Sequence, residues 1–214
     1  MGRAKGRAFV DARRRRRPVV GGFDGLAHIV EMATWIALLR GINVGGANRL
    51  PMAELRKELE NVGLDDVQTY IQTGNIVFGS DAEDEAALAG QIAATIEAAH
   101  GFRPRVLLLS AGRLREAMDA NPFPEAEAEP KTVHLYFLAE QPAHFDRAAL
   151  DGAASSTERC ELGRLVFYLH TPDGFGSSKL ASRAERILGV SATARNWRTV
   201  ARLWEMAERQ ASGG

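Results

Sequence analysis

The order of predicted strands and helices constrains this chain most, because the same order occurs twice. Apolar periodicity and turn residues indicate strand, helix, strand, strand, helix, strand between residues 34 and 109, and again between 132 and 195. A further helix follows each half. The order βαββαβ is that of the split-βαβ, or ferredoxin-like, arrangement. We therefore predict an α+β protein of two ferredoxin-like units with extra helices, and the order leaves open whether the units are intertwined by exchanging strands.

The first half begins with the apolar run Trp35 to Leu39, which is typical of a strand buried on both faces. A Gly/Asn-rich loop follows, and Pro51 then suits the first turn of a helix because that turn needs no donor at its start. The predicted elements of this half are strand 34–40, helix 51–62, strands 67–72 and 75–80, helix 83–100, strand 106–109 and helix 111–119.

The second half follows NPFPEAEAEP, residues 121–130, whose prolines and acidic residues indicate a linker. Its predicted elements are strand 132–139, helix 142–150, strands 157–162 and 164–170 about Gly163, helix 177–189, strand 191–195 and helix 197–209. The predicted domains are thus unit 34–120, linker 121–130, unit 131–209 and a tail, 210–214.

Residues 1–33 are basic and lack periodicity, which indicates a disordered arm. They hold eight of the 27 Lys/Arg residues and three of the 27 acidic residues, which leaves 19 basic and 24 acidic residues, a net charge of −5, in the body. This arm can contact nucleic acid or a membrane surface; we favour the simpler interpretation that the chain starts at Met32. The acidic body argues against nucleic-acid binding through bulk charge.

Cys160 is the single cysteine, so no intramolecular disulfide can form, and we expect a cytoplasmic protein. No apolar run approaches the length of a membrane span, and we expect neither a secretory signal nor a membrane partner.

The first candidate ligand-binding segment is the loop GINVGG with the arginine before it. Arg40 supplies charge, Asn43 supplies an amide, and the backbone amides of Gly45 and Gly46 can approach a phosphate or carboxylate without a Cβ in the way. The loop lacks the spacing of a dinucleotide fingerprint. The alternative is that the glycines only satisfy turn geometry.

The other two candidate segments precede helices. Ser178 can cap the helix that begins near Ser177, and Lys179 in its first turn opposes the helix dipole unless an anion binds there. Asn196 is a candidate cap for the last helix, and Arg198 is a candidate anion clamp. The alternatives are that Lys179 points to solvent and that Asn196 acts only as a cap.

No catalytic constellation can be named. The five histidines show no metal-ligand spacing, so we expect no metal site, and the cofactor is unknown. His134 and His170 lie on predicted strands, where packing or hydrogen bonding is the simpler role, and Cys160 is interpreted as structural.

Five motifs, in order, resemble the bacterial domain-of-unknown-function 1697 family: WIALLRGINVGG, YIQTGNIVF, NPF, GFGSSKL and ARNWRTV. The resemblance covers residues 34–208 and implies two intertwined ferredoxin-like units. It implies no activity, because the family is uncharacterised.

Together these features favour binding of a small anionic ligand, phosphorylated or nucleotide-like, by Gly/Asn-rich loops. The eight predicted ligand-binding residues are expected to converge: Arg40, Asn43, Gly45, Gly46, Ser178, Lys179, Asn196 and Arg198. The alternatives are an enzyme that uses the same pocket, with Lys179 polarising a substrate, and an RNA, DNA or protein-interaction module. The oligomeric state stays open.

Overall fold

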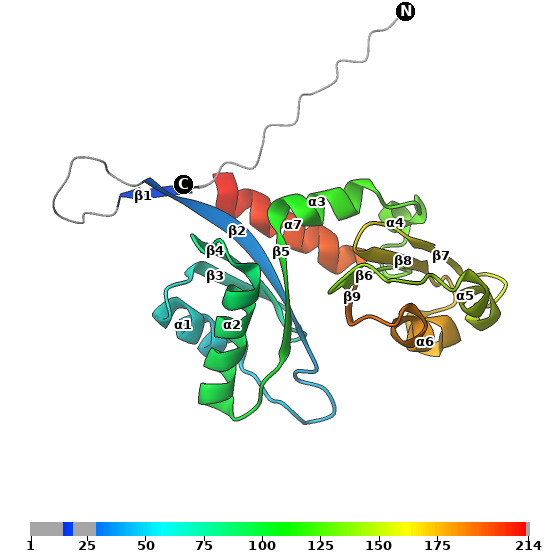
Figure 1. Cartoon of the computed structure of the whole chain (residues 1–214), viewed down its shortest axis with the longest axis horizontal. Helices are drawn as coiled ribbons and strands as arrows, with labels where there is room; N and C mark the ends of the chain where they lie inside the picture. The colour runs from blue at the N-terminus through cyan, green and yellow to red at the C-terminus, as the bar shows by residue number, and fades with distance from the viewer. Residues whose placement is uncertain (1–14, 19–28, 213–214) are drawn as a thin grey trace, which may run out of the picture.

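The computed structural model describes residues 15–18 and 29–212 and has two antiparallel sheets, each with its own helices (Figure 1). The elements of the first unit are β2 (Ile29–Arg40), α1 (Met52–Asn61), β3 (Asp65–Tyr70), β4 (Asn75–Ser80), α2 (Glu85–His100) and β5 (Arg105–Ser110). Its strands lie in the order β5-β2-β4-β3. The elements of the second unit are β6 (Val133–Leu138), α5 (Arg147–Ala153), β7 (Arg159–Leu162), β8 (Val166–His170), α6 (Lys179–Leu188) and β9 (Ala192–Asn196). Its order, β9-β6-β8-β7, repeats that of the first, which confirms the predicted fold class.

Three helices lie outside the repeated order: α3 (Ala111–Asp119), α4 (Glu125–Ala128) and α7 (Trp197–Ser212). Strand β1 (Arg15–Pro18) pairs with the beginning of β2, where the sequence indicated no regular structure; the rest of the basic arm before residue 29 lies outside the described residues. The start at Met32 stays a prediction.

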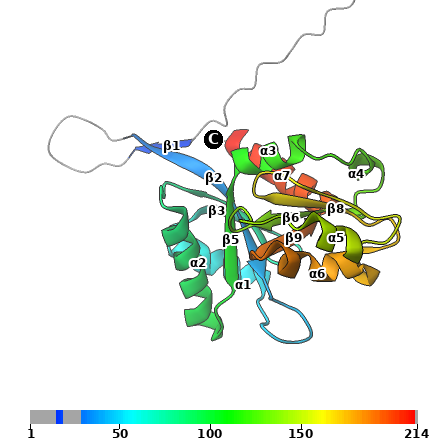
Figure 2. The same cartoon turned by 45° about the vertical axis from the view of Figure 1, so that its right-hand side comes forward.

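Each sheet is formed by one continuous stretch of chain, so the two units do not exchange strands within the described residues. The units are intertwined instead by helices. α3 and α7 pack against each other, and α7 contacts β2 and β4 of the first unit as well as β6 and β9 of the second. In Figure 1 and, turned by 45°, in Figure 2, α3 and the red α7 lie between the two sheets.

This arrangement produces three hydrophobic clusters. One lies between the first sheet and α1 and α2, and another between the second sheet and α5 and α6. The third is shared: Ile36 and Leu38 of the first sheet and Leu135 of the second pack with Val200 and Leu203 of α7. Alternate residues of a strand face opposite sides of the sheet, so β2 contributes to the shared cluster on one face and to the cluster with α1 and α2 on the other. This confirms the prediction of a strand buried on both sides.

The predicted linker, residues 121–130, contains α4, and its Phe123 and Ala126 are buried in the shared cluster. The segment therefore packs against the body as it joins the units. The predicted helix 142–150 instead begins at Arg147, because Asp146 accepts a hydrogen bond from the amide of Ala149 at 2.9 Å and so caps the helix there.

Among the described residues, no helix combines the length and the apolar character that crossing a membrane requires.

The shared cluster predicts that both units unfold together. Replacement of the fully buried Leu203 by Ala should lower the free energy of unfolding by about 2–5 kcal/mol, because it leaves a cavity between the sheets. Urea unfolding followed by tryptophan fluorescence and by circular dichroism should give one coincident transition for the native chain and for Leu203→Ala. Separate transitions for the two probes would contradict a shared core.

Candidate site at the junction of the two units

The loop after β2 is held in shape by its own asparagines. The Asn43 side chain donates to the carbonyls of Leu50 and Gln72 at 3.1 and 2.8 Å, and its Oδ1 accepts from the amide of Leu50 at 2.8 Å. Asn48 donates to the carbonyl of Gly41 at 2.8 Å. Both side-chain amide hydrogens of Asn43 are thus used by the protein itself, and a role in ligand binding stays a prediction.

The tip of the same loop is exposed and has free donors. Gly45 and Gly46 adopt φ values of +59° and +82°, so the left-handed backbone accounts for both glycines. Neither amide donates a hydrogen bond within the described part of the chain. These two amides are therefore open to an acceptor from outside the protein.

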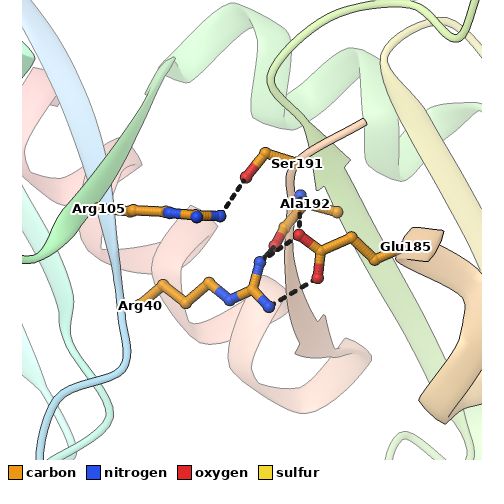
Figure 3. Close-up of polar contacts among 5 residues, drawn as sticks. All are labelled: Arg40, Arg105, Glu185, Ser191 and Ala192. Atoms are coloured by element: carbon orange, nitrogen blue, oxygen red, sulfur yellow. Dashed lines mark hydrogen bonds and ion pairs between the residues drawn. The ribbon is translucent and has the colours of Figure 1, made fainter. Parts of the chain in front are cut away.

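Arg40 lies at the end of β2 and joins the two units (Figure 3). Its guanidinium forms two hydrogen bonds to the carboxylate of Glu185 on α6, one of them at 2.6 Å, and donates to the carbonyl of Ala192 at 3.1 Å. The donation from Arg40 holds the pKa of Glu185 below its ordinary value. Arg40, predicted to meet a ligand, is occupied by an ion pair between the units.

Arg105 stands beside Arg40, its cross-strand partner on β5, and points to the same place (Figure 3). It is exposed and donates to the Ser191 hydroxyl at 3.1 Å. No sequence motif marks this residue; the antiparallel register identifies it, because that register places the first residue of β5 opposite the last of β2.

Arg195 extends into the junction from β9 and is the least solvent-exposed of the three arginines. Its Nη2 donates to the carbonyls of Leu39 and Thr73 at 2.9 and 3.0 Å, and its Nε donates to the side chain of the fully buried Asn75. Burial alone lowers its pKa to about 10, so Arg195 remains a cation at neutral pH although its acceptors are neutral.

The Thr73-Gly74-Asn75 turn is built for this contact. A Cβ at Gly74 would lie 2.6 Å from the Cβ of Leu39, so only glycine lets the turn approach β2 this closely. The close approach allows the Gly74 carbonyl to accept a hydrogen bond from the Leu39 amide at 2.7 Å. Just before it, Ile71 is exposed and has a φ of +50°, which is rare for a β-branched residue. The turn between β3 and β4 thus also supplies hydrogen-bond acceptors for Arg195.

The junction carries excess positive charge. Arg40, Arg105 and Arg195 come together there, and Glu185 is the one carboxylate that an ion pair brings to them among the described residues. The junction thus holds two positive charges more than its one carboxylate can neutralise, and the open amides of Gly45 and Gly46 lie at the tip of the loop that follows Arg40.

The other four predicted site residues lie elsewhere. Asn196 pairs with His134 at one end of the second sheet, whereas Ala192, next to Arg40, pairs with Leu138 at the opposite end. Phe175, three residues before Ser178, stacks on His134, which places the start of α6 at the end far from Arg40. The prediction that all eight residues converge is therefore not met, because α6 runs along the sheet between the two groups.

At that far end the capping roles are confirmed. Ser178 Oγ accepts from the amide of Ala181 at 2.9 Å, and Asn196 Oδ1 accepts from the amide of Thr199 at 3.0 Å. The Lys179 and Arg198 side chains are exposed. A ligand-binding role for these four residues stays a prediction.

His134, His170 and Cys160 behave as buried structural groups. His134 is 7% exposed and stacks on Phe175 with 3.9 Å between ring centroids, and His170 accepts from Arg159 at 3.0 Å. Burial raises the pKa of the Cys160 thiol, which makes it a poor nucleophile. These contacts confirm the packing roles that the sequence suggested.

A separate cavity of about 280 Å³ lies between α3, the 121–127 segment and the start of α7. Trp197 and Phe123 form part of its lining, and Arg115 at its rim is paired with Asp119 at 2.8 Å. Asp119 thus already neutralises the positive charge of Arg115, so the cavity contributes no free cation to an anion site.

These observations define a class: a duplicated α+β protein whose two ferredoxin-like units meet at an arginine-rich junction. The model of the family described as "Protein of unknown function (DUF1697)" matches residues 32–168, and the chain belongs to that family.

Among solved structures, the chain is similar to the conserved bacterial protein SP0830 from Streptococcus pneumoniae. The two are 26% identical, with a TM-score of 0.63, and the similarity covers 82% of this chain and 99% of that one. No curated protein resembles the chain closely enough to count as a match.

The contact of Arg195 predicts a large loss of stability on its removal. Arg195→Met leaves the Leu39 and Thr73 carbonyls and the Asn75 side chain without their donor, so the free energy of unfolding in urea should fall by about 2–4 kcal/mol. Arg198→Met, three residues away on an exposed side chain, is the matched control and should change it by less than about 0.5 kcal/mol. Equal effects of the two substitutions would refute the proposed role of Arg195.

His134 predicts a pH-dependent stability. Burial lowers its pKa to about 4 from the ordinary 6.5, so the unfolded chain binds more protons between these values. Its stabilisation is fully present above about pH 6.5 and is lost as the pH falls toward 4, which amounts to about 2 kcal/mol between pH 7 and pH 5. Urea unfolding at both pH values should show this loss in the native chain and in the control His144→Gln, whose histidine is exposed, but not in His134→Gln.

Proposed function

We propose that this protein binds a small anionic ligand, phosphorylated or nucleotide-like, at the junction of its two units. The observation that supports the proposal is that Arg40 and Arg105 both act on the Glu185 carboxylate, while Arg195 is held by neutral oxygens in the same junction, so the positive charges outnumber the one carboxylate by two. Guanidinium groups bind phosphate and carboxylate through paired hydrogen bonds.

Arg105 and the Gly45–Gly46 amides are the groups that face a ligand in this proposal. Arg105 is exposed, donates a hydrogen bond to a hydroxyl and acts on Glu185 only through its charge, and the two amides have no acceptor within the described residues. Arg40 and Arg195 stay in their contacts between the units and contribute electrostatic potential. Asn43 keeps the loop in shape.

Binding without turnover is favoured over an enzyme by the state of Glu185. Its carboxylate is held by Arg40 and its pKa is lowered, so at neutral pH it is neither a proton donor nor a free base. We place the binding reaction in the cytoplasm, since the single Cys160 is a buried thiol. The acidic body disfavours nucleic acid as the ligand.

Titration calorimetry with inorganic pyrophosphate and with a nucleoside diphosphate tests the proposal. Replacement of Arg105 by Gln should weaken the binding of either anion about tenfold, as expected for one charge-assisted contact. Arg103→Gln is the matched control, because Arg103 is exposed, lies two residues away and pairs with Glu97, so its loss should leave affinity unchanged.

Absence of binding of both anions by the native chain would refute the proposal. Equal weakening by Arg105→Gln and Arg103→Gln would show that only general charge is measured, and would also refute it.

A further inference from the structure

A second cluster of chemically active side chains lies on the outer face of the first unit, away from the junction. Glu54 and Glu58 are one turn apart on α1, and His100 is the last residue of α2. One ligand atom from each of the three side chains lies within 4.8 Å of the other two. Three side chains from two helices therefore face a common point.

The spacing is close to that of a metal coordination sphere. Nε2 of His100 and Oε2 of Glu58 are 3.0 Å apart. In a tetrahedral site with bonds of about 2.0–2.1 Å, neighbouring ligand atoms are separated by about 3.4 Å. Glu54 is exposed, so a change of rotamer can bring its carboxylate to the same distance without moving the backbone.

The charges at this point favour a cation. Two carboxylates at positions i and i+4 of one helix repel each other, and the Glu54 side chain has no ion pair or hydrogen bond within the described residues. The C-terminal end of α2, where His100 lies, adds the negative end of a helix dipole. His100 is the anchored member, since its side chain is only 12% exposed and packs near Phe102.

We propose that Glu54, Glu58 and His100 bind a divalent transition-metal ion such as Zn²⁺, with water at the remaining coordination position. An imidazole together with carboxylates suits first-row transition metals, whereas Mg²⁺ and Ca²⁺ take oxygen ligands alone. The ion links α1 to α2 over the first sheet. No metal site was expected from the sequence, because His100 lies 46 and 42 residues after Glu54 and Glu58.

The alternative explanation of the cluster is a plain ion pair between His100 and Glu58. That pair needs no third side chain, whereas a metal site needs Glu54 as well. Glu54→Gln therefore distinguishes the two, and it leaves the fold intact because the Glu54 side chain has no partner within the described part of the chain.

The experiment is calorimetric titration of the full-length chain with Zn²⁺, and separately with Mg²⁺ and Ca²⁺. The native chain should bind Zn²⁺ more tightly than Mg²⁺ or Ca²⁺, and Glu54→Gln and His100→Gln should each weaken Zn²⁺ binding at least tenfold. Glu60→Gln, on an exposed position of the same helix, is the control and should bind as the native chain does. A matching rise of the melting temperature with Zn²⁺ should disappear in Glu54→Gln.

Failure to bind Zn²⁺, preference for Mg²⁺ or Ca²⁺, or unchanged affinity in Glu54→Gln would overturn the proposal. Weakening in Glu60→Gln equal to that in Glu54→Gln would do the same. None of these results bears on the anion site, because the metal ligands lie on α1 and α2 and the junction arginines on β2, β5 and β9.

Discussion

The guanidinium of Arg195 is the contact on which the relation of the two units depends. It is a cation held by neutral oxygens of β2 and of the β3–β4 turn, so its burial has a desolvation cost that only several well-placed hydrogen bonds can offset. Those oxygens lie where they do because Gly74 lets the turn approach Leu39. This side chain, together with the hydrogen bonds from Arg40 to Ala192 and from Arg105 to Ser191, positions β9 against the first sheet.

Two further sets of contacts join the units besides those of Arg195. The shared core places α3 and α7 between the sheets, and the Arg40–Glu185 pair closes the edge of the junction. Partly exposed ion pairs of this kind contribute little stability by themselves, so the shared apolar cluster, not Arg40, holds the units together. The arginines determine the orientation of the two units and leave positive charge at the edge of the junction.

The structure divides the predicted ligand residues by what their atoms already do. The Asn43 side chain hydrogen-bonds within its own loop, and the side chains of Asn196 and Ser178 cap helices. The Gly45 and Gly46 amides remain open. The residue that strengthens the anion-binding proposal, Arg105, had no motif around it. Its importance comes from standing next to Arg40 across two strands that are far apart in the chain.

The sequence by itself determined the elements of both units and their order, because strand and helix periodicities and turn residues are local properties. It identified the strand buried on both faces and the caps at Ser178 and Asn196, and it indicated structural roles for His134, His170 and Cys160. The tertiary structure alone decided that the units keep their own strands, that α7 serves both, and that GINVGG and GFGSSK lie at opposite ends of the second sheet. It also decided which arginines meet at the junction and which glutamates face His100. The physical reason is that these contacts join residues distant in the chain, and strand register and helix packing bring them together in a way that no local pattern encodes.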